Sequence, residues 1–228
     1  MAAYIDEFTY PFVLKPATTA LLIVDLQKAT GSLQHGLAKM LRAQGRLDES
    51  QYRFDRILYT IIPNTQKLLA AFRGVGAPVI FITYGAETPD ASDVARHIRA
   101  IVKATNNIAG QPEHELVDAL KPLPTEPVLN KTTIGAFGST GIDSRLKAMG
   151  VTEVVVVGVS TNNCAGMTAM EAADKGYGAV LVSDATGTCS DRMQLAFEEM
   201  FVRLWGRVLS TDQTIAELQT QNLLKAAE

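Results

Sequence analysis

Several features that define particular protein classes are scarce or missing in this sequence of 228 residues. It has two cysteines, too few for a disulfide framework in a chain of this length, so we expect a reducing compartment, the cytoplasm. No apolar run approaches the ~20 residues of a membrane helix, and the first residues lack the pattern of a signal peptide. The net charge of −3 comes without any basic block. We therefore expect neither a membrane partner nor a nucleic-acid partner.

What the sequence does have is a regular alternation of apolar runs with helical patterns, which is typical of parallel βαβ units. The expected strands cover residues 19–25, 77–83, 128–130, 154–159, 179–183 and 206–211. No linker or internal repeat interrupts the alternation. We predict one α/β domain over residues 1–228: a three-layer, doubly wound sheet of six parallel strands, in the order 3-2-1-4-5-6, with helices on both faces.

The expected helices fill the intervals between these strands. They cover residues 37–44, 53–73 with a start or kink at Pro63, 93–103, 114–120, 142–149, 165–175, 191–204 and 214–223. Residues 28–52 form a long insertion that we place over the carboxyl edge of the sheet, where loops determine specificity.

Cys164 lies at the junction of the most apolar strand with the helix that follows it. Residues 154–159 are almost all β-branched, and the turn-forming segment STNN at 160–163 comes directly before the cysteine. Open α/β sheets bind their ligands at this edge. Because helix N-termini favour thiolate, we expect Cys164 to be a reactive nucleophile.

Asp25 and Lys131 also lie at the carboxyl ends of expected strands, so the fold brings both toward Cys164. A thiol nucleophile needs a base to take its proton and a positive group to stabilise the ion pair. Each residue has a structural alternative: Asp25 as the cap of the next helix, Lys131 as a solvated surface lysine, and Cys164 as an inert buried thiol. Their coincidence at one sheet edge favours the catalytic interpretation.

Four segments make the chain similar to the isochorismatase-like cysteine hydrolases, which include nicotinamidase, N-carbamoylsarcosine amidase, ureidoacrylate amidohydrolase and biuret hydrolase. The segments are LIVDLQ at 22–27, KTTIGAF at 131–137, GVSTNNC at 158–164 and TAMEAA at 168–173. The likeness runs over roughly residues 18–215, and the GVSTNNC segment is the most specific.

The resemblance implies a catalytic triad of Asp25, Lys131 and Cys164. It also implies a cis peptide bond between Val159 and Ser160, which turns the Ser160 N–H toward that of Cys164, so that the two form an oxyanion hole. The implied activity is hydrolysis of a C–N bond through a thioester intermediate, with release of ammonia or an amine. The family is commonly homo-oligomeric, so we expect a dimer or tetramer.

Departures from the family pattern narrow the range of expected substrates. The segment after the second strand has no histidine where nicotinamidases carry an Asp-x-His metal motif, and His35, His97 and His114 show no ligand spacing. We therefore expect no metal and no other cofactor. Cys164 argues against vinyl ether cleavage, because true isochorismatases lack this cysteine. A small linear amide, ureide or carbamoyl compound remains the expected substrate.

Gln27, Tyr84, Phe137 and Thr161 lie on the loops of the carboxyl edge and are the expected substrate contacts. Four arginines in or near the insertion either recognise a substrate carboxylate or form a solvated helix face or subunit contact: Arg42, Arg46, Arg53 and Arg56.

The alternatives are a nicotinamidase-type or isochorismatase-type hydrolase, or a non-catalytic scaffold with this fold. A dinucleotide-dependent oxidoreductase is excluded, because no G-x-G-x-x-G follows the first strand.

Overall fold

Six parallel strands form one sheet in the computed structural model, which describes residues 4–226. The strand order is β3-β2-β1-β4-β5-β6, which confirms the predicted order. The strands are β1 (Thr19–Val24), β2 (Val79–Tyr84), β3 (Val128–Lys131), β4 (Glu153–Val159), β5 (Gly178–Gly187) and β6 (Arg207–Leu209). β1, β2 and almost all of β4 are buried because helices cover both faces, which explains their continuous apolar sequences.

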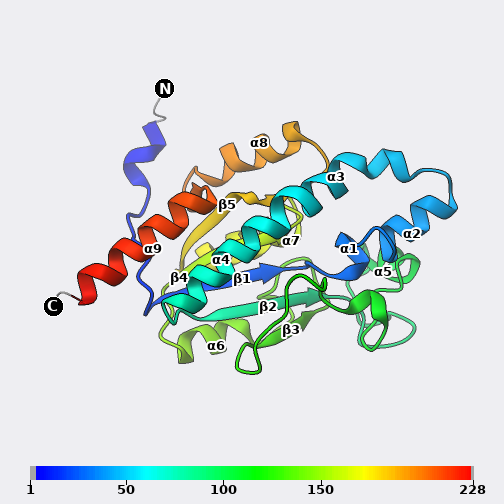
Figure 1. The fold of residues 1–228 in the computed structure, drawn as a ribbon, viewed down its shortest axis with the longest axis horizontal. Helices are drawn as coiled ribbons and strands as arrows, with labels where there is room; N and C mark the ends of the chain where they lie inside the picture. Colours follow the sequence, from blue (N-terminus) through cyan, green and yellow to red (C-terminus); the bar gives the residue numbers. More distant parts are fainter. Residues whose placement is uncertain (1–3, 227–228) are drawn as a thin grey trace.

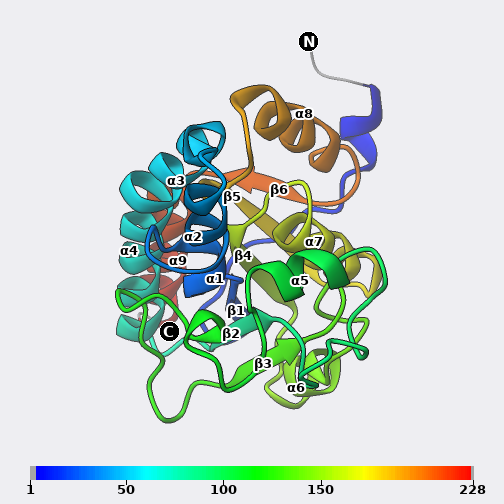
Figure 2. The ribbon, with the colours of Figure 1, turned by 90° about the vertical axis from the view of Figure 1, so that its right-hand side faces the viewer.

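Helices cover both faces of the sheet (Figures 1 and 2). On one face α4 (Ile62–Gly74) and α9 (Thr211–Ala226) pack on alternate residues of the central strands, with Phe72 and Leu218 in the core. On the other face lie α6 (Ile142–Ala148), α7 (Cys164–Asp174) and α8 (Asp191–Phe201). None of the helices described within residues 4–226 is long and apolar enough to cross a membrane.

The predicted insertion is largely helical and lies at the end of the molecule toward which β1 and β2 point (Figure 1). It contains α1 (Lys28–Gly31), α2 (Gly36–Ala43) and a 3₁₀ turn, Leu47–Ser50. α3 (Gln51–Arg56) continues through a π-helical turn, Ile57–Ile61, directly into α4. Pro63 is near the start of α4, so the change of helical geometry precedes the proline as expected.

Two predicted helices differ from the structure. Residues 114–120 are not helical: a 3₁₀ turn covers Pro112–His114, and Leu116 then bridges to Gln27. α5 (Arg99–Ala104) begins later than predicted, because the Asp93 carboxylate accepts the Glu87 N–H in a loop before the helix. Both predictions were wrong where tertiary hydrogen bonds hold the chain in another conformation.

Candidate active site

Asp25 follows β1 directly, and its backbone is fixed by two hydrogen bonds. Its φ of 54° lies in the left-handed region, which aspartate tolerates better than most residues. Its N–H donates to the Ile82 carbonyl at 2.9 Å, and its carbonyl oxygen accepts from the Thr30 hydroxyl at 2.5 Å. The side chain is 1% exposed, and Oδ1 has no hydrogen-bond partner among the described residues. One carboxylate oxygen is therefore free to accept a proton.

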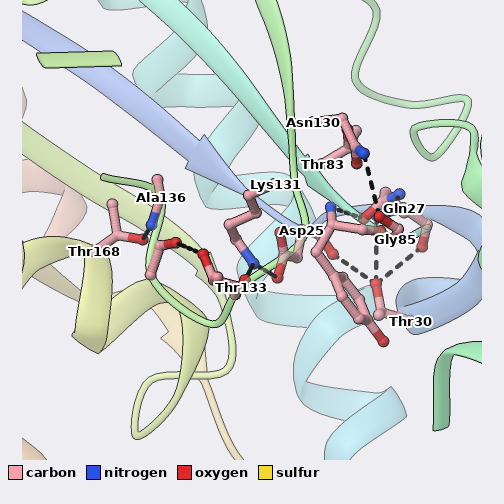
Figure 3. A network of polar contacts seen from close by, with 12 residues as sticks. Asp25, Gln27, Thr30, Thr83, Gly85, Asn130, Lys131, Thr133, Ala136 and Thr168 are labelled. Carbon is pink, nitrogen blue, oxygen red and sulfur yellow. Dashed lines mark hydrogen bonds and ion pairs between the residues drawn. The ribbon is translucent and has the colours of Figure 1, made fainter. Parts of the chain in front are cut away.

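Lys131 is the last residue of β3, and its ammonium group lies against Asp25 (Figure 3). Nζ donates to Asp25 Oδ2 at 3.0 Å and to the Thr133 carbonyl at 3.2 Å, and it lies 5.0 Å from the centre of the Tyr84 ring. Burial alone lowers the pKa of Lys131, but the negative charge of Asp25 opposes this effect and the pKa is raised overall. Lys131 is therefore not a solvated surface lysine: it is a buried cation paired with Asp25.

Cys164 is the first residue of α7 and is 8% exposed. Burial, and then the negative charge of Asp25, raise the pKa of Cys164 to about 12, and the charge of Lys131 only partly offsets them. The helix N-terminus, which favours thiolate, does not by itself make this thiol acidic, so the expected nucleophile needs a neighbouring base. At neutral pH the resting sulfur of Cys164 is therefore a thiol.

Burial also raises the pKa of Asp25, although Lys131 and Arg53 act in the opposite direction. A raised pKa makes the carboxylate a stronger base than an exposed aspartate. The arrangement is therefore suited to proton transfer from the thiol to Asp25.

The Val159–Ser160 peptide bond is cis, as the resemblance implied. Within residues 4–226, the backbone N–H groups of Ser160 and Cys164 donate to no protein acceptor. The N–H of Cys164 is one of the free donors at the start of a helix. The two groups are therefore free to bind an oxyanion.

A cavity of about 340 Å³ opens at this edge of the sheet. Its polar lining includes Asp25, Arg53, Tyr84, Ser160, Asn163 and Cys164. Part of its apolar lining comes from Leu37 of α2 and Ile101 of α5, so the insertion forms part of the wall. The volume suits a small molecule.

Of the four expected substrate contacts, only Tyr84 lines the cavity. Gln27 is fully buried and holds two loops together (Figure 3 shows it beside Thr30). Its Nε2 donates to the His114 carbonyl at 2.8 Å, and its Oε1 accepts from the Tyr84 N–H at 2.9 Å. The structure therefore does not place Gln27 on the cavity, and its amide is occupied by the protein itself.

Phe137 and Thr161 are also absent from the cavity lining. The Phe137 ring packs against Tyr177 at 6.0 Å, and its N–H donates to the Glu171 carboxylate at 2.9 Å. The Thr161 hydroxyl is buried and donates to Gln194 at 2.7 Å. Both residues are thus in contact with other parts of the protein, and the structure does not place them on the cavity.

Other cavity residues were not identified from the sequence. Thr30 lies outside the segments that carry the family resemblance, whereas Ile134 and Asn163 lie within KTTIGAF and GVSTNNC but were not among the expected substrate contacts. Cys189, the second cysteine of the chain, is exposed and lines the same cavity as Cys164. No group of three or more His, Cys, Asp or Glu side chains suited to a metal ion occurs in the described part of the chain.

The sequence matches the family model described as Isochorismatase domain over residues 19–213. The ureidoacrylate amidohydrolase of Methylobacterium radiotolerans is 30% identical over 190 residues, which cover 77% of this chain and 69% of the relative. The corresponding amidohydrolase of Agrobacterium fabrum is 28% identical and covers 77% of this chain and 78% of the relative.

Solved structures share the fold. A cysteine hydrolase from Pseudomonas syringae pv. phaseolicola has a TM-score of 0.74 at 22% identity, covering 93% of this chain and 99% of that chain. The N-carbamoylsarcosine amidase of Thermoplasma acidophilum has a TM-score of 0.65 at 24% identity, covering 86% of this chain and 97% of that chain.

Proposed function

The chain belongs to the isochorismatase family and is an amidohydrolase. We propose that it hydrolyses a small linear amide, ureide or carbamoyl compound, with Cys164 as the nucleophile. The observation that carries this proposal is the buried ion pair of Lys131 and Asp25, 3.0 Å apart, whose Asp25 lines the same cavity as Cys164. A buried ion pair contributes little to stability by itself. Its place beside a thiol supports a chemical role.

In the proposed first half-reaction, Asp25 Oδ1 accepts the proton of the Cys164 thiol while Sγ attacks the carbonyl carbon of the substrate. The carbonyl oxygen becomes an oxyanion that accepts hydrogen bonds from the N–H groups of Ser160 and Cys164. Asp25 then donates its proton to the departing nitrogen as the C–N bond breaks. Ammonia or an amine leaves, and the acyl group remains on Cys164 as a thioester.

The second half-reaction uses the same groups with water as the nucleophile. Asp25 accepts a proton from water while the water oxygen attacks the thioester carbon. The N–H groups of Ser160 and Cys164 then donate hydrogen bonds to the second oxyanion. When the C–S bond breaks, the proton returns to the sulfur. Lys131 stays charged throughout and keeps Asp25 ionised between proton transfers.

An ammonia-release screen tests this function. Candidate compounds are biuret, triuret, ureidoacrylate, N-carbamoyl amino acids and maleamate, with nicotinamide included to test the nicotinamidase-type alternative. We expect turnover of at least one linear compound and none in Cys164→Ala, with both proteins equally folded by circular dichroism. Hydrolysis that survives in Cys164→Ala would contradict the nucleophilic role of the cysteine.

The assembly proposed with this function is a homo-oligomer, a dimer or tetramer, that acts in the cytoplasm. Light scattering coupled to size-exclusion chromatography measures the mass of the assembly directly. A mass equal to the 24.6 kDa chain would contradict the expected oligomer.

A further inference from the structure

Arg53, directly after the insertion, brings a positive charge to the wall of the cavity. It lies in α3 and is half-buried. Its Nη1 donates to the Ser160 hydroxyl at 2.8 Å, so the guanidinium is held at the residue whose N–H is proposed to bind the oxyanion. The side chain is therefore fixed next to the proposed reaction centre.

The charges around the cavity do not balance. The negative charge of Asp25 is matched by Lys131 at 3.0 Å. The Arg53 guanidinium forms no ion pair with an acidic side chain of residues 4–226. With Cys164 as a neutral thiol, the site holds one excess positive charge. A ligand with one negative charge would neutralise it.

The hydrogen-bonding capacity of Arg53 is also incompletely used. Nη1 is bonded to Ser160, whereas Nε is buried without an acceptor and Nη2 donates to no described residue. A planar guanidinium presents its donors in a fork that fits carboxylate oxygens. Donors left without partners in a partly buried site lower the free energy of binding for a ligand that supplies acceptors.

The other three arginines of the insertion region differ from Arg53 in their surroundings. Arg56 donates to the carbonyl oxygens of Thr186 and Ser183 at 3.0 and 2.7 Å. Arg46 pairs with Glu49 at 2.7 Å, and Arg42 is exposed on α2. None of these three lines the cavity.

We propose that Arg53 binds a carboxylate of the substrate, so that the substrate is a small amide, ureide or carbamoyl compound that also carries a carboxylate. This inference rests on the proposed function and narrows it to anionic substrates. The apolar lining formed by Leu37, Ile98 and Ile101 suits a short hydrocarbon segment between the two polar groups.

Calorimetry with two matched probes tests the proposal. Succinamic acid carries a carboxylate, and succinamide replaces it with a neutral amide of nearly the same shape. In the Cys164→Ala background, which prevents turnover, we expect the acid to bind about 10- to 100-fold more tightly than the amide. We expect Arg53→Gln to remove this preference and Arg53→Lys to retain part of it. Equal binding of the two probes, or a preference that survives Arg53→Gln, would overturn the proposal.

Two control variants separate charge recognition from indirect effects. Ser160→Ala removes the hydroxyl that holds Arg53 but no charge, so it should weaken the preference for the acid less than Arg53→Gln does. Arg42→Gln removes an exposed arginine outside the cavity and should leave both affinities unchanged. If Arg42→Gln abolished the preference as Arg53→Gln does, recognition by Arg53 would be refuted.

This experiment also distinguishes a failure of the inference from a failure of the proposed function. Binding to Cys164→Ala requires no chemistry, whereas the proposed function depends on ammonia release by the wild-type enzyme. If the wild-type enzyme releases ammonia but the acid and the amide probes bind equally, only the role of Arg53 is refuted and the proposed function stands. A preference for the acid without hydrolysis of any compound refutes the proposed reaction and leaves the anion site in place.

Discussion

Lys131 Nζ lies 3.0 Å from Asp25 Oδ2, and the two side chains are 0% and 1% exposed. Moving both charges out of water costs free energy that their attraction only partly returns. Lys131 has three interactions around its ammonium group, whereas Asp25 keeps one oxygen without a partner. The pair therefore holds a carboxylate in a buried place with one oxygen available to the neighbouring thiol.

Replacing Lys131 by methionine should destabilise the fold as well as abolish turnover. The substitution keeps most of the volume but leaves a buried carboxylate without its counter-charge, which costs about 3–5 kcal/mol. Denaturant-induced unfolding measures this loss. The double variant Asp25→Asn/Lys131→Met should be more stable than Lys131→Met alone, because it removes the unpaired charge. If the two substitutions were simply additive, the residues would not form a coupled pair.

Cys164 should react slowly with iodoacetamide at pH 7 in a Cys189→Ser background, because burial and Asp25 raise the pKa of its thiol to about 12. At such a pKa only about one molecule in 10⁵ is a thiolate. Asp25→Asn removes a negative charge that raises this pKa, and each unit of decrease gives about tenfold more thiolate. We therefore expect Asp25→Asn to be alkylated faster while losing hydrolysis. Mass spectrometry follows the labelling, and slower labelling of Asp25→Asn would contradict the proposed resting state.

In the dependence of kcat/KM on pH, the acidic limb should report the ionisation of Asp25. Catalysis requires the carboxylate, and burial raises its pKa, so the limb should lie above the usual range of an aspartate. The positive charge of Arg53 lowers the pKa of Asp25. Removing it in Arg53→Gln should raise that pKa and move the limb to higher pH. The profile is measured with a neutral amide, so that substrate ionisation does not contribute. A limb that moved to lower pH would show that another group controls it.

The sequence predicts the strands well where both faces of a strand are buried. The runs at β1, β2 and β4 are largely apolar and buried. The ends of β1, β3 and β4 bring Asp25, Lys131 and Cys164 to one edge. β5 extends to Gly187, beyond the predicted end at residue 183, because a register shift lets Thr186 pair with Gly158. That pairing depends on a distant strand and leaves no local pattern.

Features of the site that depend on tertiary structure were not predictable in the same way. The position of Cys164 follows from its place after β4, but its protonation state depends on burial and on the charge of Asp25. All four arginines near the insertion look alike in the sequence, and only the path of α3 places Arg53 on the cavity. Gln27 follows Asp25 closely, and its buried contacts with distant loops distinguish it from a substrate contact.

Replacing Gln27 by leucine should therefore reduce stability more than it alters substrate binding. The change leaves the Tyr84 N–H and the His114 carbonyl without their Gln27 partner, at a cost of about 2–4 kcal/mol in the free energy of unfolding. Gln66→Leu is the matched control. Its Nε2 donates to the Ala119 carbonyl at an exposed site, so its effect should stay within about 0.5 kcal/mol. Urea titrations and KM values of both variants decide whether Gln27 supports the fold or contacts the substrate. If Gln27→Leu kept full stability and raised only KM, Gln27 would contact the substrate after all.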